Sequence, residues 1–412
     1  MTAPVESAAP SRPGAVRGVY FPAVEGLRAI AAGLVFVHHL GFFSGATFSS
    51  SLGGLLDTLD VGVPVFFALS GFLLFRPQVE AILDDRALPA PARFWWRRLW
   101  RIYPAYWVVL TLVYLVFRPE VSTQAPVREY WIHYLLLQIY PSDGVFWGIS
   151  QAWSLAVEVS FYAILPLLAM GAKRWVSGRP VSQRAVLLLG GCAGLYGVSV
   201  LWRLIAMRQD WSFNTTLWLF GTIDYFAIGM ALAIVHTWSR RRDVGARVER
   251  LLTTSGWWWW LGALAVLVFI GYQLGLPRDA EGRAAWHVEL YRQFGYGVVT
   301  FLVVVPPIFG AVGSSLHRFL TLRPVVGLGV ISYSFYLWHT TVIEEWFAVT
   351  DRTPIFGWGL GEISFPSVAF FSLVGTTFAV TVALSWVTYR LIERPALTFS
   401  HRVGPSAGAR RS

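Results

Sequence analysis

Arg28 and His39 lie within the first long apolar segment of this chain, and together they are its clearest candidates for chemistry. Ionisable side chains at membrane depth are costly, so they are kept mainly where they act on protons, ions or ligands. The two residues are eleven positions apart, which puts them on one helix face within roughly 20°. His38 falls roughly 80° from that face. Helical phase therefore selects His39, and not His38, as the companion of Arg28.

A second candidate is the basic cluster formed by Arg97, Arg98 and Arg101. Spacings of three and four residues bring these side chains to one side of a helix. Guanidinium groups match phosphate oxygens with paired hydrogen bonds, so the cluster suits a polyphosphate. Anionic lipid headgroups are the alternative ligand. We place Pro104, which follows directly, in the first turn of a membrane helix.

A polar stripe marks another apolar segment, where Ser154, Glu158 and Tyr162 recur every four residues. Glu158 would lie well inside the membrane, where a carboxylate must pair, protonate or face water. Two interpretations stay open for it. The stripe is either a hydrogen-bonded tie between helices or part of an active site.

Other polar side chains within apolar segments are weaker candidates. Ser332, Tyr336 and His339 share one helix face, although a lone histidine there is more typical of a satisfied interhelical contact. Asp224 is a similar case. Ser70 precedes a glycine in mid-segment, where small residues usually mean close helix packing.

The composition indicates a protein that crosses the membrane many times. Of its 412 residues 55% are hydrophobic and only 14% are charged, whereas soluble domains carry about 25% charge. A single cysteine excludes an intramolecular disulfide and a multi-cysteine metal cluster. We predict an all-α membrane bundle with ten spans. They are residues 24–43, 57–76, 102–118, 151–171, 185–206, 217–238, 255–275, 293–313, 325–346 and 365–389.

Basic residues predict that both termini are cytoplasmic. With that orientation, all but eight of the 33 basic residues fall on the inner side, as the positive-inside rule expects. The eight are Arg118, Arg128, Arg203, Arg208, Arg278, Arg283, Arg292 and Arg352. The net charge of +10 is therefore mostly a topology signal and does not indicate nucleic-acid binding.

The remaining segments receive simpler predictions. Residues 127–140 are too short and aromatic for a span, and we place them as an outer interfacial or re-entrant helix. Residues 1–20 lack the apolar core of a signal peptide, so we predict flexible cytoplasmic tails at 1–20 and 398–412. For Glu393, near the second tail, we expect a salt bridge with Arg390 or Arg394.

Six strings in this order resemble the acyltransferase-3 family of integral membrane acyltransferases, over about residues 20–397. Each string alone is weak, but six in order across ten spans are specific. They are Gly26-Leu-Arg with His39 eleven residues later, Phe66-Phe-Ala-Leu-Ser-Gly-Phe, Arg97-Arg-Leu-Trp-Arg-Ile-Tyr-Pro, Trp153-Ser-Leu-Ala-Val-Glu-Val-Ser-Phe-Tyr, Ser332-Tyr-Ser-Phe-Tyr-Leu-Trp-His and Ile392-Glu-Arg-Pro.

The resemblance implies a membrane domain over residues 21–397. It implies transfer of an acyl group, often acetyl, from cytoplasmic acyl-CoA to a hydroxyl of a carbohydrate, glycolipid or natural product. We expect a multi-pass protein of a bacterial inner membrane, with no metal. The family's essential arginine and histidine map onto Arg28 and His39. Its basic motif maps onto Arg97, Arg98 and Arg101. We predict that His39 and Glu158 are catalytic. The predicted substrate or support residues are Ser70, Trp153, Ser154, Tyr162, Asp224, Ser332, Tyr333, Tyr336 and His339.

Two departures from the family pattern matter. Many members carry an arginine two residues before Asp224, where this chain has Thr222, and that puts a role of Asp224 in acceptor binding in doubt. Some members also carry a second catalytic domain after the last span, which we do not expect here.

For such a reaction we expect His39 to act as the general base, because a neutral imidazole can take the proton of a hydroxyl. Arg28 would lie about 16 Å away along the helix. With the Arg97 cluster it would hold the nucleotide end of CoA, while the thioester reaches His39. We favour an acceptor in the cell envelope over a macrolide-like product.

A different class of protein stays open, namely a proton-coupled transporter with His39, Glu158 and His339 as a relay. It would not need the arginine cluster, and we see no inverted repeat of the kind that transporters often carry. A membrane scaffold without chemistry would leave the charges within the spans unexplained.

Overall fold

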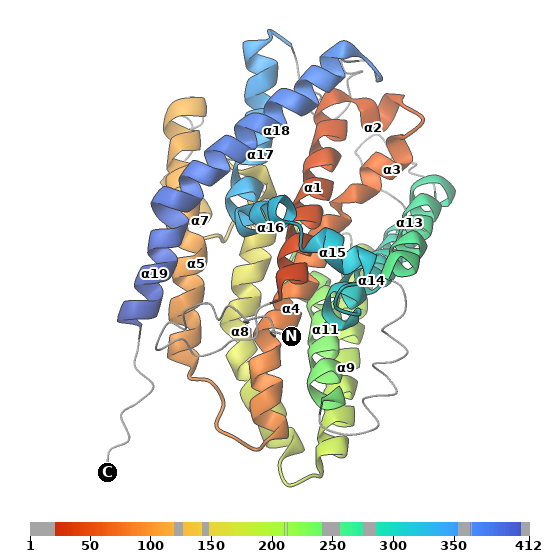
Figure 1. Cartoon of the computed structure of the whole chain (residues 1–412), viewed down its shortest axis with the longest axis vertical. Helices are drawn as coiled ribbons and strands as arrows, with labels where there is room; N and C mark the ends of the chain where they lie inside the picture. The colour runs from red at the N-terminus through yellow and green to blue at the C-terminus, as the bar shows by residue number, and fades with distance from the viewer. Residues whose placement is uncertain are drawn as a thin grey trace, which may run out of the picture.

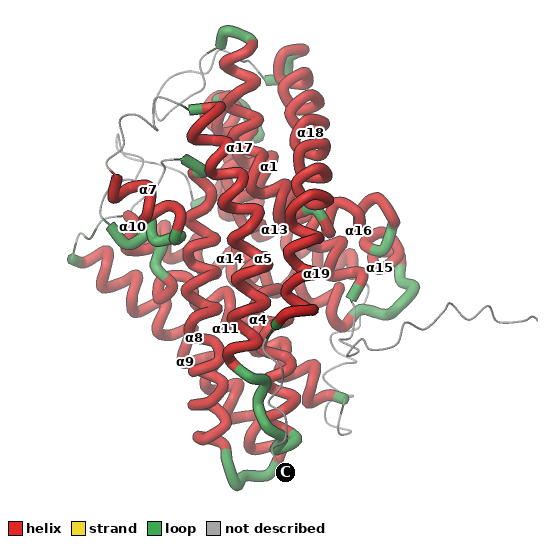
Figure 2. The backbone as a smooth tube through the Cα atoms, turned by 90° about the vertical axis from the view of Figure 1, so that its left-hand side faces the viewer, coloured by secondary structure: helices red, strands yellow, loops and turns green. Residues whose placement is uncertain are grey.

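The computed structural model describes residues 21–118, 127–141, 148–209, 211, 213–240, 256–274, 286–352, 363 and 365–404. Within these residues the chain is helical and has no strand (Figure 2). The main helices are α1 (Pro22–Ser44), α4 (Gly62–Leu83), α5 (Pro91–Leu112), α8 (Trp153–Val176), α9 (Val181–Arg208), α11 (Leu219–Ser239), α13 (Gly256–Gln273), α14 (Trp286–Phe309), α17 (Ser332–Val349), α18 (Val368–Thr388) and α19 (Arg394–Val403). Short elements connect them: α2 (Ala46–Ser49), α3 (Gly53–Thr58), η1 (Leu59–Val61), η2 (Val113–Phe117), α7 (Val127–Tyr134), η3 (Ser150–Ala152), α10 (Phe213–Thr216), α15 (Ser315–Leu320), α16 (Arg323–Val330) and η4 (Tyr389–Glu393).

Eight helical stretches in the described residues are long and apolar enough to cross a membrane, and each covers one of the predicted spans. The other two predicted spans differ. In the span predicted at 255–275, the described helix α13 (Gly256–Gln273) has 18 residues and falls short of these criteria. Residues 325–346 are not one helix, because the chain breaks at Ile331 between α16 and α17. The all-α bundle predicted from the sequence is thus confirmed.

Helix α5 begins eleven residues before the span predicted at 102–118. Pro91 occupies its first turn, where a missing N–H costs nothing. Pro104 therefore lies inside the helix, and the prediction that it opens a helix is wrong. The arginine cluster is consequently part of the continuous helix that runs alongside the core.

Close packing of α4 against α11 forms the centre of the bundle. A Cβ atom added to Gly229 would lie 1.8 Å from the carbonyl oxygen of Ala68, and one added to Gly71 would lie 2.3 Å from that of Phe226. Only glycine lets the two backbones approach this closely. The glycine after Ser70 thus has the packing role that the sequence suggested.

Residues 127–140 do not form a span, and we propose the re-entrant alternative for them and call them the re-entrant segment. Helix α7 ends at Tyr134, and the chain turns back through Leu136 at φ 57°. Its freed carbonyls are capped by α5, because the Tyr103 hydroxyl donates to Leu135 O (3.2 Å) and the Tyr106 hydroxyl to His133 O (2.7 Å). These donors lie midway along the stretch Pro91–Phe117. Non-helical backbone at such depth needs internal partners, and these supply them.

The C-terminal helix extends past residue 398, where the sequence predicted a flexible tail to begin. Helix α19 continues to Val403 because Phe399 packs on Trp100, with ring centroids 4.6 Å apart. Figure 1 shows α19 beside α5, with α17 and α18 at one end of the molecule and α9 and α11 at the other. The predicted tails at 1–20 and 405–412 lie outside the described residues.

Candidate functional site

His39 contacts His339, a residue 300 positions away on α17. The Nδ1 atom of His39 lies 2.9 Å from the carbonyl oxygen of Val35 and 3.2 Å from Nε2 of His339. The Nδ1 atom of His339 lies 2.9 Å from the carbonyl oxygen of Tyr336. Carbonyl oxygens only accept, so both rings carry their hydrogen on Nδ1.

That tautomer has a chemical consequence for His39. Its Nδ1–H is shared between Val35 O and the bare Nε2 of His339, so its own Nε2 keeps a free lone pair. None of the described residues forms a hydrogen bond to that atom. The ring is partly exposed, and it stacks on Phe43 with centroids 6.3 Å apart. The arrangement leaves an unprotonated ring nitrogen that can accept a proton.

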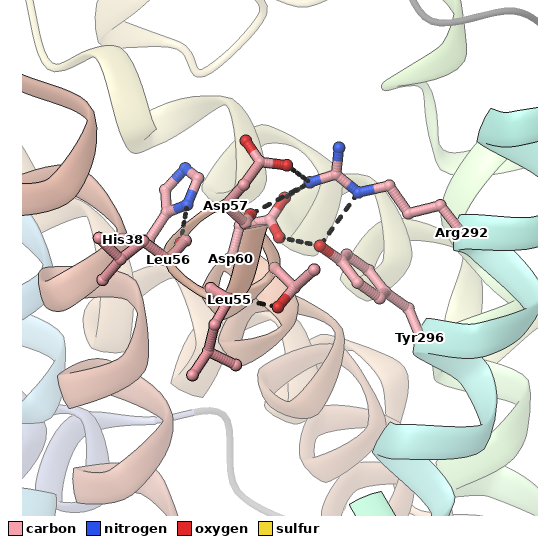
Figure 3. Close-up of polar contacts among 8 residues, drawn as sticks. His38, Leu55, Leu56, Asp57, Asp60, Arg292 and Tyr296 are labelled. Carbon is pink, nitrogen blue, oxygen red and sulfur yellow. Dashed lines mark hydrogen bonds and ion pairs between the residues drawn. The ribbon is translucent and has the colours of Figure 1, made fainter. Parts of the chain in front are cut away.

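His38 faces a different environment, as its helical phase predicts. Its Nδ1–H donates to the carbonyl of Leu56 at 3.1 Å. Figure 3 shows it beside the ion cluster of Asp57, Asp60 and Arg292, at the junction of α3, η1 and α14. Two adjacent histidines thus serve two separate networks.

Arg28 lies at the other end of the α1 stripe and also contacts α17. Its Nε donates to the hydroxyl of Ser332 at 3.3 Å, and its guanidinium lies 5.8 Å from the ring centroid of Phe66. Glu25 is 3.7 Å away on the preceding turn. The stripe of α1 therefore meets the Ser332, Tyr336 and His339 face of α17 at both ends.

Beside Arg28 lies a cavity of about 50 Å³, whose wall combines polar and apolar side chains and does not include His39 or His339. A volume of this size admits a few water molecules. Its polar lining consists of Arg28, Ser70, Ser154, Glu158, Ser332, Tyr333 and Tyr336. Four helices contribute to it, namely α1, α4, α8 and α17.

Glu158 receives two short hydrogen bonds at one carboxylate oxygen. The Ser70 hydroxyl and the Tyr162 hydroxyl each donate to Oε1 at 2.5 Å. Ser70 comes from α4, so the contact does tie two helices, and it also lines the cavity. One turn nearer the start of α8, the hydroxyls of Ser154 and Tyr336 lie 2.7 Å apart.

Some predicted site residues lie outside this cavity. Asp224 accepts from Ser199 (2.9 Å) and from Gln293 (2.6 Å), which places it among α9, α11 and α14. Trp153 packs edge-on against Phe67 with centroids 6.4 Å apart. Tyr333 does line the cavity, and its hydroxyl donates to the carbonyl of Ile102 at 2.6 Å.

The three arginines of the basic cluster differ in their partners. Arg101 forms an ion pair with Glu393 (2.9 Å), which also accepts from Ser334 (2.9 Å). The prediction that Glu393 pairs with Arg390 or Arg394 is therefore wrong, because its carboxylate is buried against α5. Arg97 and Arg98 have no carboxylate within 4 Å among the described residues.

Sequence reasoning missed Gln151, which fixes α8 to α17. Its Nε2 donates to the carbonyls of Tyr336 (2.8 Å) and Leu337 (3.1 Å), and its Oε1 accepts from Thr340 (2.6 Å). The only sequence signal was its position just before the Ser154 stripe. A glutamine that starts a membrane helix has no partner visible in the sequence.

The fold and this cavity define a multi-pass membrane protein with a buried cluster of ionisable groups. The chain belongs to the acyltransferase family: residues 21–390 match the acyltransferase domain Acyl_transf_3. Within the described residues no cluster of metal-ligating side chains occurs.

Two bacterial relatives match nearly the whole chain. The peptidoglycan O-acetyltransferase OatA of Listeria monocytogenes is 26% identical over 394 residues, which is 91% of this chain and 56% of that protein. The O-acetyltransferase OatA of Staphylococcus aureus is 24% identical over 397 residues, with 91% and 57% covered. The chain thus spans little more than half the length of these relatives. No solved structure matches it.

Proposed function

We propose that the protein transfers an acyl group, in the first place acetyl, from acyl-CoA to a hydroxyl of a cell-envelope glycan, with His39 as the general base. The observation that carries the proposal is the orientation of His39, whose Nδ1–H is engaged by Val35 and His339 while Nε2 is left free. The relatives' names add peptidoglycan as the acceptor to test first.

The reaction follows from that free lone pair. Nε2 of His39 takes the proton of the acceptor hydroxyl as its oxygen attacks the thioester carbonyl. The C–S bond breaks, and the leaving thiolate recovers the proton from Nε2. Each atom is then accounted for, and His39 returns to its starting tautomer.

Arg28 and the Arg97 cluster bind the acyl donor in this proposal. Arg97 and Arg98 can offer their guanidinium groups to CoA phosphates because neither forms an ion pair within 4 Å with a described carboxylate. Arg101 contributes less directly, since Glu393 already holds it. At about 50 Å³ the cavity beside Arg28 holds water rather than the pantetheine arm, which needs a wider path to reach His39. The arginine bias of the loops predicts that this end of the path opens to the cytoplasm of a bacterial inner membrane.

The decisive test uses purified protein in nanodiscs, labelled acetyl-CoA and a peptidoglycan fragment. His39→Ala should lower kcat by about 10²–10⁴-fold, the usual contribution of a general base. His38→Ala is the matched control and should stay close to wild type, because His38 belongs to the Leu56 contact. Full activity of the His39→Ala variant would contradict the proposal.

The same preparation addresses the transporter alternative. Acyl-CoA should bind to the solubilised protein, and Arg98→Ala should weaken that binding by about tenfold or more. In the structure Glu158 bonds to Ser70 and Tyr162, so it does not extend the pair of His39 and His339 into a relay. Proton uptake by proteoliposomes without acyl-CoA binding would favour transport instead.

A further inference from the structure

A second cavity lies outside the central one, along the seam between α5 and α8. It encloses about 250 Å³ and is lined mostly by apolar side chains, including Trp95, Leu99, Val159 and Ala163. Tyr162 separates it from the central cavity, because its ring lines the seam while its hydroxyl donates to Glu158. We call this space the seam groove. Of the residues used in the proposed acyl transfer, it shares Arg98.

The seam groove is closed at one end and open at its side. The re-entrant segment bridges its two walls, since the Tyr103 hydroxyl donates to Leu135 O (3.2 Å) and Tyr140 pairs with Ser160 on α8 (2.6 Å). Leu99 on the open side is 49% exposed and lies within a candidate membrane span. When this stretch spans the membrane, the opening lies on its bilayer-facing side. From Trp95 to Tyr103 the groove follows α5 for about 12 Å.

Arg98 lines the same groove and carries an unused hydrogen-bond donor. Its guanidinium lies 5.9 Å from the ring centroids of both Phe94 and Tyr162. Its Nε is buried and forms no hydrogen bond with the described residues. Arg97 has the same unmet Nε. A buried donor without a partner is costly, so a bound acceptor would stabilise it.

We propose that the seam groove binds an anionic phospholipid, with one acyl chain along the seam and the phosphate on Arg98. An apolar groove open to the bilayer takes a hydrocarbon chain, and the guanidinium selects a phosphate that carries net negative charge. The site does not depend on the acyl-transfer proposal. If both hold, lipid and CoA compete for Arg98, so bound lipid should weaken the binding of acyl-CoA.

The test is native mass spectrometry of the delipidated full chain titrated with phosphatidylglycerol or phosphatidylcholine. Wild type should bind one phosphatidylglycerol more tightly than phosphatidylcholine. Ala163→Phe and Val159→Phe fill the groove and should each weaken that binding by about tenfold. Leu167→Phe is the matched control, because it lies on the same exposed face of α8 one turn farther along. It should bind lipid as wild type does.

Three further measurements distinguish the contribution of the lipid headgroup to binding from that of the acyl chain. Arg98→Gln should abolish the preference for phosphatidylglycerol but keep a bound chain. Glycerol 3-phosphate alone and diacylglycerol alone should each bind more weakly than phosphatidylglycerol. Unchanged phosphatidylglycerol binding in both filled variants would overturn the proposal, as would equal binding of the two phospholipids by wild type. Filled variants that keep the lipid but lose acyl-CoA binding would assign the groove to the acyl donor, which also overturns it.

Discussion

At the scale of single residues, His339 has a role that its own sequence context does not show. Its bare Nε2 accepts from His39 Nδ1–H, and its own Nδ1–H is fixed by the carbonyl of Tyr336. In a serine-hydrolase triad an aspartate orients the histidine in the same way. Here a neutral ring would do so, which avoids a second buried charge.

We therefore predict that His339 is a positioning residue. His339→Leu should lower kcat for acyl transfer by about tenfold, the loss of roughly one hydrogen bond, and leave KM for acyl-CoA unchanged. His339→Gln should recover most of the rate, because its amide oxygen can reach the place of Nε2. The measurement is steady-state kinetics of both variants in nanodiscs. Equal losses in the two variants, or a change confined to KM, would contradict this role.

At the scale of helices, the contact between α4 and α11 depends on glycines, because a residue with no side chain lets the two backbones approach closely. A Cβ at Gly229 would overlap the carbonyl of Ala68, and backbone cannot move aside as a flexible side chain can. Such a contact fixes how the wall that carries Ser70 lies against its neighbour.

Gly229→Ala should consequently destabilise the bundle by about 1–3 kcal/mol, the range for overpacked cores. Gly190→Ala on α9 is the control, because a Cβ there would meet nothing within 4 Å. Alanine also favours the helix by up to about 1 kcal/mol. Thermal unfolding in detergent should therefore show a lower Tm for the first variant only. An unchanged Tm for Gly229→Ala would mean that the helices separate freely.

The helices also show what the sequence could and could not predict. Apolar runs are local, so eight spans were predicted from them directly. The start of α5 was missed because its first turns are rich in arginine and tryptophan rather than uniformly apolar. The break at Ile331 was missed because both halves are apolar. Stripes within one helix, such as Ser154 and Glu158, follow from the helical period alone.

Contacts between helices followed no such local rule. Glu393 has two arginines as near neighbours in sequence, yet it pairs with Arg101 on α5. The partner of His39 likewise depends on how α1 packs beside α17. Such pairings are decided by tertiary packing, which a single sequence does not specify.

At the scale of the whole molecule, the Arg101–Glu393 ion pair joins an early helix to the C-terminal end of the bundle. The Glu393 side chain is fully buried, and Arg101 is 24% exposed. Removing one partner of a buried pair leaves an uncompensated charge, whereas replacing both with apolar residues is often neutral.

Arg101→Leu should thus destabilise the protein by about 3–5 kcal/mol, and the double variant Arg101→Leu/Glu393→Leu should recover most of that loss. Thermal unfolding in detergent measures both. If the double variant were as unstable as the single one, the pair would contribute more than mutual neutralisation, and this account of it would be wrong.

The contact between His39 and His339 has a consequence for biosynthesis. The two histidines are 300 residues apart, so the ribosome has synthesised His39 long before it synthesises His339. A nascent chain that has inserted α1 to α14 already holds Arg28 and the arginine cluster, but its His39 still lacks the ring that orients it. The contact that orients His39 would then form only with the last fifth of the chain, and a product truncated before α17 would lack it.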